Sequence, residues 1–310
     1  MTEPNPLETV EYEVSPVAGF KSGDALGNLH VIVEAGGCSH PGKIRDCNED
    51  HFMICRIRRQ MDLLSTNVPE EDVPRHAEWD GYILAVADGL GGHSAGERAS
   101  QLALKKGLDL VLAQANWALM LNDEEESRLI ARMREYFSEI DKCLNQEVEI
   151  DPALKGMATT LTVAYTVGLR AFLLHVGDSR IYRLRSGRLE QLTRDHTVAQ
   201  GMLDAGQITA DQLRHHARRH VLTNVLSGRP GDVVPDISSF QLQHGDRLLL
   251  CSDGLNEMLP DDAIATILLQ HPDPDDAANA LVQEANNRGG RDNITAVVAN
   301  YTVEAPGMKT

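Results

Sequence analysis

Short apolar runs of strand length, separated by glycine turns, recur along the chain. Residues 82–87 form one such run, which is typical of a fully buried strand. Residues 159–166 instead alternate between apolar and polar side chains, which also predicts a strand. Further strand-length runs lie at residues 31–35, 51–56, 171–176, 181–184, 189–192, 246–251 and 294–300. Between 159 and 192 the runs follow one another across glycine turns, which predicts an antiparallel meander rather than alternating β-α-β units.

Apolar residues at helical spacing predict two long helices after the first glycine turn. One is expected over residues 94–115 and the other at about 123–147, where several acids in the first turn suit the helix dipole. These two helices would form an antiparallel layer on a sheet. Shorter helices are expected at about residues 198–205, 210–216, 260–270 and 275–287.

Polar stretches set the predicted boundaries of the folded part. Residues 1–30 carry three prolines, several acids and no sustained periodicity, so we predict an N-terminal extension there. The main folded domain is expected over residues 31–303, followed by a short tail at 304–310. Residues 36–46 are predicted to form a loop, and residues 57–79 an exposed loop between two strands.

The composition is that of a globular protein, and its charge disfavours some classes of partner. The 310 residues could hold about two average domains, although layered folds of this size are often single units. No apolar run approaches the roughly 18 residues that a membrane span needs. A net charge of -17 argues against nucleic acid or an anionic membrane as partner, because both favour basic surfaces.

The amino end and the cysteines both bear on the compartment. The chain begins without the basic start and apolar stretch of a secretory signal, so a cytoplasmic location is expected. Its five cysteines are an odd number and form no C-x-x-C pair. Free thiols are therefore favoured over disulfides or a structural zinc site.

The apolar run at 82–87 leads directly into Asp88 and a glycine-rich turn. An isolated Asp-Gly pair is ordinary turn chemistry. A dinucleotide-binding G-x-G-x-x-G is a second interpretation, but it fails at its sixth place, which is Ser94. The same arrangement, an apolar run ending in an acidic residue beside a small one, recurs at Asp178 and Asp253. This recurrence favours a site for a hard cation.

Acidic residues lie at four predicted strand edges: Glu49 with Asp50, Asp88, Asp253 and Asp292. Each one alone is more typical of a cap or a turn. Together they would offer an all-oxygen site for Mg²⁺ or Mn²⁺, provided that the fold gathers the strand ends. Two such ions about 3.5 to 4 Å apart can hold both oxygens of an in-line phosphoryl displacement and lower the pKa of a bridging water.

Seven motifs between about residues 35 and 301 occur in the order found in one known family. They are Arg45-x-x-x-Glu49-Asp50, Asp88-Gly-Leu-Gly-Gly-His93, Met157-Ala-Thr-Thr-Leu161, Gly177-Asp-Ser-Arg180, Leu192-Thr-Arg-Asp-His196, Ser252-Asp-Gly254 and Asp292-Asn-Ile-Thr295. Any one of them would be a weak signal, whereas all seven in order are highly specific. The chain resembles the metal-dependent protein phosphatase 2C family, especially its bacterial branch.

The resemblance implies an α+β fold, a four-layer α-β-β-α sandwich with two central antiparallel sheets. It also implies a protein serine/threonine phosphatase that hydrolyses phosphoserine and phosphothreonine by in-line attack of a water or hydroxide bridging two metal ions. The cofactors would be two Mg²⁺ or Mn²⁺ ions, with a third in many members. The partners would be phosphorylated proteins, the products of a serine/threonine kinase, and we expect a monomer.

The resemblance assigns the two main ions to four positions. Asp88 would bridge both ions, and the carbonyl of Gly89 would bind the second. Asp253 and Asp292 would complete the shell of the first. This set combines three of the strand-edge acids with one backbone oxygen.

The remaining motif positions take other roles by the same resemblance. Glu49 and Asp50 would act on the two ions directly or through waters. Asp178 would hold the third, weaker ion. Arg45 would grip the substrate phosphate, for which a planar guanidinium is better suited than the amine of lysine.

The chain departs from the family pattern at two places, and the role of one further region is open. Many animal members carry a histidine, proposed as general acid, where this chain has Leu90; His93 is shifted within the turn. Glu257 stands where some members have an aspartate that helps to hold the third ion. Residues 195–227 match a mobile flap of bacterial members. Within it, the basic stretch 214–220 is expected to be a surface near the site, either meeting phosphopeptides or facing solvent, rather than a set of metal ligands.

Two other functions fit the same fold. A pseudophosphatase would bind a phosphoprotein without turnover, but the complete set of core acids disfavours it. An esterase for small phosphorylated molecules would share every motif, and only a comparison of rates would separate it from a protein phosphatase. The sequence names neither the substrate nor the general acid.

Overall fold

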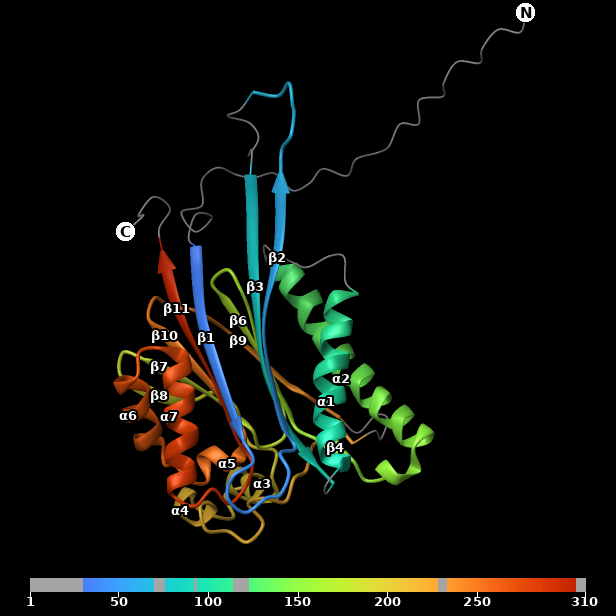
Figure 1. Ribbon diagram of the computed structural model, residues 1–310, viewed down its shortest axis with the longest axis vertical. Helices are drawn as coiled ribbons and strands as arrows, with labels where there is room; N and C mark the ends of the chain where they lie inside the picture. Colours follow the sequence, from blue (N-terminus) through green and yellow to red (C-terminus); the bar gives the residue numbers. More distant parts are fainter. Residues whose placement is uncertain (1–29, 70–75, 92–93, 114–122, 228–232, 305–310) are drawn as a thin grey trace, which may run out of the picture.

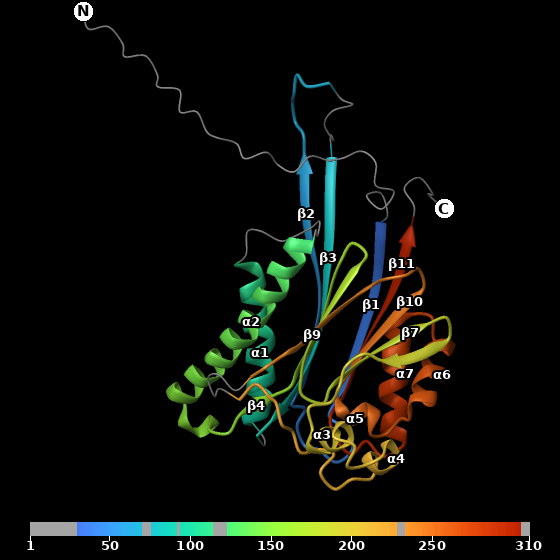
Figure 2. The same cartoon turned by 180° about the vertical axis from the view of Figure 1, so that it is seen from behind.

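A computed structural model of the chain describes residues 30–69, 76–91, 94–113, 123–227 and 233–304. Two antiparallel sheets lie face to face, and helices cover the outer face of each (Figure 1; Figure 2 gives the reverse view). The predicted α-β-β-α sandwich is therefore confirmed. Most of the predicted extension and tail, residues 1–29 and 305–310, lies outside the described residues.

Each sheet combines strands from distant parts of the chain, and all neighbouring strands are antiparallel. The first sheet has the order β1 (His30–His40), β11 (Ile294–Glu304), β10 (Asp246–Cys251), β7 (Arg180–Arg185) and β8 (Arg188–Gln191). The second sheet has the order β2 (Asp50–Asp62), β3 (His76–Leu90), β5 (Leu161–Val167), β6 (Arg170–Val176) and β9 (Asp236–Gln241), with β4 (Ala158–Thr159) paired to the end of β3.

The helices fall into two outer layers and a group at one end of the sandwich (Figure 1). The second sheet is covered by α1 (Ser94–Leu112) and α2 (Asp123–Ile150), and the first by α6 (Asp261–Gln270) and α7 (Pro274–Asn287). Short helices lie at one end: α3 (Val198–Asp204), α4 (Ala210–Leu213) and α5 (Asp253–Asn256), with a 3-10 turn at Pro152–Leu154. Within the described ranges, no helix combines the length and apolar character that crossing a membrane requires.

Three apolar cores hold the four layers together, and β3 contributes to two of them. Leu84 and Val86 belong to the core between the sheets, whereas Ala85 and Ala87 belong to the core beneath α1 and α2. A strand buried on both faces needs apolar residues at every position. This explains why residues 82–87 form a continuous apolar run rather than an alternating one.

The predicted loop at 36–46 is wrong in its first part, because β1 continues as far as His40. β1 pairs with β11 along its whole length. A Cβ at Gly37 would lie 2.6 Å from the ring of Phe52, so glycine leaves the space that this neighbouring aromatic side chain occupies. The two glycines of β1 therefore serve packing rather than a turn.

The predicted exposed loop at 57–79 is wrong at both ends, because β2 continues to Asp62 and β3 begins at His76. β2 and β3 continue into it and pair with each other beyond the rest of their sheet, forming a two-stranded arm (Figure 1). Asp80 binds two arginines of the facing strand, Arg56 through Nε (2.9 Å) and Arg58 through Nε (3.0 Å). Cross-strand ion pairs of this kind support a strand whose sequence is too polar for a core.

The predicted meander between 159 and 192 is wrong in one respect. β5 and β6 form a hairpin in one sheet, and β7 and β8 form a hairpin in the other. The chain changes sheets at residues 177–179, between β6 and β7. This crossover places Asp178 between the two sheets rather than in an ordinary hairpin turn.

Adjacent leucines on α6 give a direct test of the core beneath that helix. Leu268 is 1% exposed and Leu269 is 56% exposed. Leu268→Ala should lower the free energy of unfolding by about 2–5 kcal/mol, because it leaves a cavity in a packed core. Leu269→Ala should change it by less than about 0.5 kcal/mol. Urea denaturation of both variants measures the difference, and equal losses would contradict this packing.

Candidate metal centre

Three carboxylates from three segments meet at the end of the sandwich where the short helices gather. Asp88 lies near the end of β3, Asp178 in the crossover between β6 and β7, and Asp253 at the start of α5. One carboxylate oxygen from each of the three lies within 4.8 Å of the other two. The fold thus brings together three of the acids that the sequence singled out.

Two threonines from the next segment of the sheet fix the backbone of Asp88. The amide of Asp88 donates to Thr160 Oγ1 (3.0 Å), and its carbonyl accepts from Thr159 Oγ1 (2.9 Å) and the Thr160 amide (2.9 Å). With all its backbone polar groups bonded, Asp88 is held at one position relative to β5.

The crossover that carries Asp178 is held from both sides. Gly177 has a φ of 116°, which favours glycine, and a Cβ there would lie 2.4 Å from the Thr160 side chain. The hydroxyl of Ser179 is 2.9 Å from Thr160 Oγ1. Thr160 therefore links the turn of Asp178 to the backbone of Asp88.

Asp50 pairs with Asp88 across β2 and β3 and is almost fully buried, with 3% of its surface exposed. Its Oδ2 accepts hydrogen bonds from Ser252 Oγ (2.6 Å) and Thr295 Oγ1 (2.8 Å). Its Oδ1 has no hydrogen-bond partner among the described residues. A buried carboxylate oxygen without a donor is costly unless a cation or a proton balances it.

The proximity of these acids changes their protonation. Burial and the neighbouring carboxylates of Asp50 and Asp253 raise the pKa of Asp88 well above its ordinary value. Burial and Asp253 raise the pKa of Asp178 as well. Burial raises the pKa of Asp50 to about 7, although its two hydroxyl donors act in the opposite direction.

The donor set fits Mg²⁺ or Mn²⁺. The three close residues all offer carboxylate oxygens, which these cations prefer to sulfur ligands. The unpartnered Oδ1 of Asp50 is a further oxygen in need of a positive neighbour. Divalent cations would relieve both the repulsion among the acids and the cost of burying them.

Glu49 lies apart from the three close carboxylates. Its carboxylate is against Gly96, in the first turn of α1. Its amide donates to Asn293 Oδ1 (2.8 Å), and its carbonyl accepts from the Gly89 amide (3.2 Å) and the Ser100 hydroxyl (2.6 Å). A Cβ at Gly89 would lie 2.2 Å from the Gly96 carbonyl oxygen, so only glycine lets the end of β3 approach α1 this closely.

Arg45 and Asp292 form an ion pair at the rim, with 2.7 Å between Arg45 Nη2 and Asp292 Oδ2. The Arg45 side chain remains 56% exposed. Asn293 holds the loop that carries Arg45, because its Nδ2 donates to the carbonyls of Pro41 (3.0 Å) and Cys47 (2.8 Å). Asp292 is thus outside the close group of three acids, although its charge acts on Asp50.

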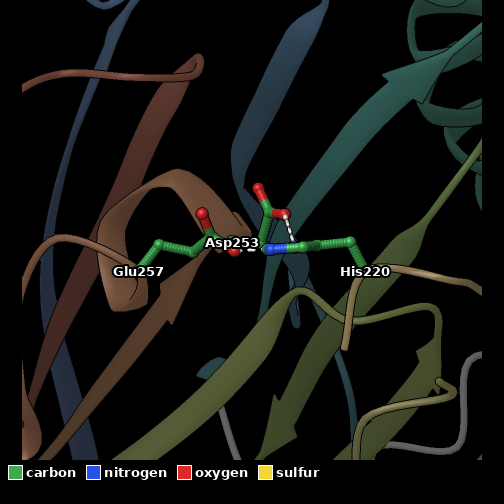
Figure 3. Close-up of side chains that lie close together, drawn as sticks. All are labelled: His220, Asp253 and Glu257. Carbon is green, nitrogen blue, oxygen red and sulfur yellow. Dashed lines mark ion pairs between the residues drawn. The ribbon is translucent and has the colours of Figure 1, made fainter. Parts of the chain in front are cut away.

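His220 contacts the site from the predicted flap (Figure 3). Its Nδ1 is 2.7 Å from Glu257 Oε1 and 3.8 Å from Asp253 Oδ2. Contact with Asp253 and the charge of Glu257 raise the pKa of His220. These three residues form a second group with the spacing of metal ligands, and Asp253 belongs to both groups. The expectation that 214–220 lies near the site therefore holds for His220, whereas its expected lack of a metal-ligand role stays a prediction.

Sequence reasoning also missed the residues that position the acids. Four hydroxyl side chains that bond to Asp50 or Asp88 lie inside the motifs quoted for the resemblance: Thr159, Thr160, Ser252 and Thr295. Their positions within these motifs could have predicted that they hold the acids by hydrogen bonds. Leu90 ends β3 and pairs with Ala158, and His93 lies outside the described residues.

Comparisons with known proteins agree with the motif order. The family model described as protein phosphatase 2C matches residues 62–285. This match covers Asp88, Asp178 and Asp253; Arg45, Glu49, Asp50 and Asp292 lie outside it.

Two curated relatives and one solved structure are similar over most of this chain. The serine/threonine protein phosphatase PstP of Mycobacterium tuberculosis is 39% identical over 70% of this chain, which spans 40% of that relative's length. The protein phosphatase PhpP of Streptococcus pneumoniae is 34% identical over 72% of this chain and 87% of its own length. A crystal structure of the PstP catalytic domain in complex with two manganese ions is 32% identical and covers 88% of this chain and 100% of that chain, with a TM-score of 0.68.

The raised pKa of Asp50 predicts a pH-dependent stability of the metal-free protein. Protonated Asp50 stabilises the fold at low pH, and this contribution is lost as the pH rises from about 4 through about 7. Thermal unfolding in chelator should therefore show Asp50→Asn gaining stability over the wild-type chain as the pH rises, by a few degrees at pH 8. Asp262→Asn, which alters an exposed acid of α6, is the control and should gain nothing. A constant difference between Asp50→Asn and the wild-type chain at every pH would contradict the prediction.

Proposed function

Because this chain belongs to the protein phosphatase 2C family, we propose that it is a metal-dependent protein serine/threonine phosphatase. The observation that carries the proposal is the meeting of Asp88, Asp178 and Asp253 within 4.8 Å at one end of the sandwich. Three carboxylates from separate segments would repel one another without a cation between them. The name of the PstP relative supports the substrate class, phosphoserine and phosphothreonine in proteins, and the name of PhpP supports a protein substrate.

In this proposal two Mg²⁺ or Mn²⁺ ions occupy the centre. Asp88, the Gly89 carbonyl, Asp253 and Asp292 would hold them, with Glu49 and Asp50 acting directly or through waters and Asp178 holding a third ion. The ions supply Lewis acidity, which neutralises charge on the phosphoryl oxygens and makes water a better nucleophile. The chain's own part is to fix the carboxylates through Thr160, Ser252 and Thr295.

Arg45 is the proposed anchor for the substrate phosphate. Its guanidinium lies at the rim, is more than half exposed and already binds one carboxylate, that of Asp292. The same planar group can bind two phosphate oxygens. Its anchored loop would orient the phosphoester toward the acids and restrict its motion during the reaction.

Several broader expectations remain part of the proposal. The catalytic domain would span residues 31–303, with 195–227 as its flap. The substrates would be the products of a serine/threonine kinase, and the protein would act as a monomer in the cytoplasm. All five cysteines are free thiols in the described structure, which is compatible with a reducing compartment.

Removal of the metal or of its central ligands should abolish turnover. We expect phosphate release from phosphothreonine peptides with Mn²⁺ or Mg²⁺, none from phosphotyrosine peptides, and none with excess chelator. Asp88→Asn and Asp253→Asn should each lower kcat by at least about 100-fold, because each loses a charged ligand. Asp262→Asn, an exposed change on α6, should retain full activity. Undiminished turnover in the two ligand variants would refute the metal assignment.

Substitution of Arg45 should separate phosphate binding from metal binding. Arg45→Ala should lower kcat/KM by roughly 10- to 100-fold, because hydrogen bonds to a charged group are lost. Arg45→Lys should recover part of this loss, since an amine keeps the charge without the planar fork. Lys43→Ala, in the same loop, is the control. Steady-state kinetics on one phosphothreonine peptide measure all three, and unchanged values for Arg45→Ala would exclude its proposed role.

A further inference from the structure

A cavity of about 570 Å³ lies beside the metal centre, between the predicted flap and α5. Asp178 and Asp253 line it on the side of the metal centre. The flap contributes Arg214 and Arg219, and the loop before β11 contributes Arg291. The cavity therefore borders the proposed reaction centre, and these three guanidinium groups line it together with Arg180 of β7.

These three guanidinium groups differ from many of the arginines that the structure describes. Acidic residues outnumber Lys and Arg by 46 to 29, and arginines elsewhere in the chain are commonly paired with a carboxylate. Arg180, which also lines the cavity, binds both oxygens of Asp195 (2.9 and 2.7 Å). Arg214, Arg219 and Arg291 have no ion pair within the described part of the chain.

The acids that line the cavity do not neutralise these arginines. Asp178 and Asp253 belong to the metal centre, Glu257 is in contact with His220, and Asp195 is bound to Arg180. Asp261, in the first turn of α6, is the remaining lining acid. Once cations occupy the centre, the cavity therefore carries an excess of positive charge.

The charge of Arg219 reaches the acids of the cavity wall. Burial and Asp253 raise the pKa of Glu257, and the positive charges of His220 and Arg219 oppose this rise. Arg219 is thus close enough to Glu257, a neighbour of Asp253, for its charge to act on that carboxylate. An anion held by Arg219 would lie in the cavity that Asp178 and Asp253 of the metal centre also line.

We propose that Arg214, Arg219 and Arg291 form a subsite for a second anionic group on the substrate chain. The substrate class would be phosphopeptides that carry another phosphate or an acidic side chain close to the hydrolysed phosphoresidue. This inference rests on the proposed phosphatase function. Guanidinium groups suit both phosphate and carboxylate, so the chemistry of the subsite is the same for either source.

The size of the cavity limits how far apart the two anions can be. A volume of about 570 Å³ corresponds to a space on the order of 10 Å across, which about three residues of extended chain span.

The subsite would also offset the repulsion between the negatively charged protein and an acidic substrate. A protein with a net charge of -17 repels acidic substrates at long range, so a local cluster of cations is needed to select them.

The test compares three peptides that share one phosphothreonine: one with neutral flanks, one with Asp or Glu within three residues on either side, and one with a second phosphoresidue there. The wild-type chain with Mn²⁺ should show a kcat/KM about five- to tenfold higher for the second and third peptides than for the first. Arg219→Ala and Arg291→Ala should remove this preference through KM. Turnover of a small aryl phosphate and of the neutral peptide should change little.

Arg218→Ala is the matched control, because Arg218 neighbours Arg219 on the flap and does not line the cavity. It should leave the preference intact. Equal kcat/KM for the three peptides, or equal losses on all three in Arg219→Ala and Arg291→Ala, would overturn the subsite. A preference for the doubly phosphorylated peptide alone would assign the subsite to phosphate, and a preference for both would assign it to any anion.

Failure of the proposed function gives a different result. In that case neither the aryl phosphate nor any peptide would be hydrolysed by folded protein with either cation. Fluorescence anisotropy of the same labelled peptides then tests the subsite without turnover. Tighter binding of the doubly anionic peptides, lost in Arg291→Ala, would support it, and equal binding of all three would overturn it.

Discussion

Mutual repulsion among carboxylates held at one end of the sandwich is the constraint on which the rest of the structure depends. Asp50, Asp88, Asp178 and Asp253 would separate if their backbones were free to move. Hydroxyl groups and backbone amides prevent this, and Thr160 and Ser252 each bond to more than one of the segments that meet there. The fold therefore keeps an unfavourable arrangement of charge that divalent cations would convert into a favourable one.

Much of the architecture follows from local sequence patterns. The run at 82–87, the alternation at 159–166 and the two long helical patterns all correspond to elements of the structure. The alternation did not mark an exposed face, however, because Thr160, Thr162 and Thr166 are buried as well. The failures have a common cause. β1 continues through its glycines, and the arm of β2 and β3 forms from polar residues, because pairing with a distant strand outweighs local preference.

The site was harder to predict from the sequence than the fold was. Acids at strand ends signalled Asp88, Asp178 and Asp253, which meet, but the same signal did not distinguish Glu49 and Asp292, which lie outside that group. His220 could not be linked to Glu257 from sequence, since 37 positions separate them and the stretch around His220 is merely basic and polar. The contacts of a long connection such as 195–227 depend on its position in the folded protein. The local amino-acid composition does not predict that position.

The division of the ligands between the sheets has a mechanical consequence. Asp88 lies near the end of a strand of one sheet, Asp253 follows a strand of the other, and Asp178 lies where the chain passes between them. The apolar side chains between the sheets, Leu84 and Leu250 among them, interdigitate and resist sliding. The packing of that core therefore fixes the distance between the carboxylates of Asp88 and Asp253. A change of side-chain volume deep between the sheets would thus alter cation affinity without touching any ligand.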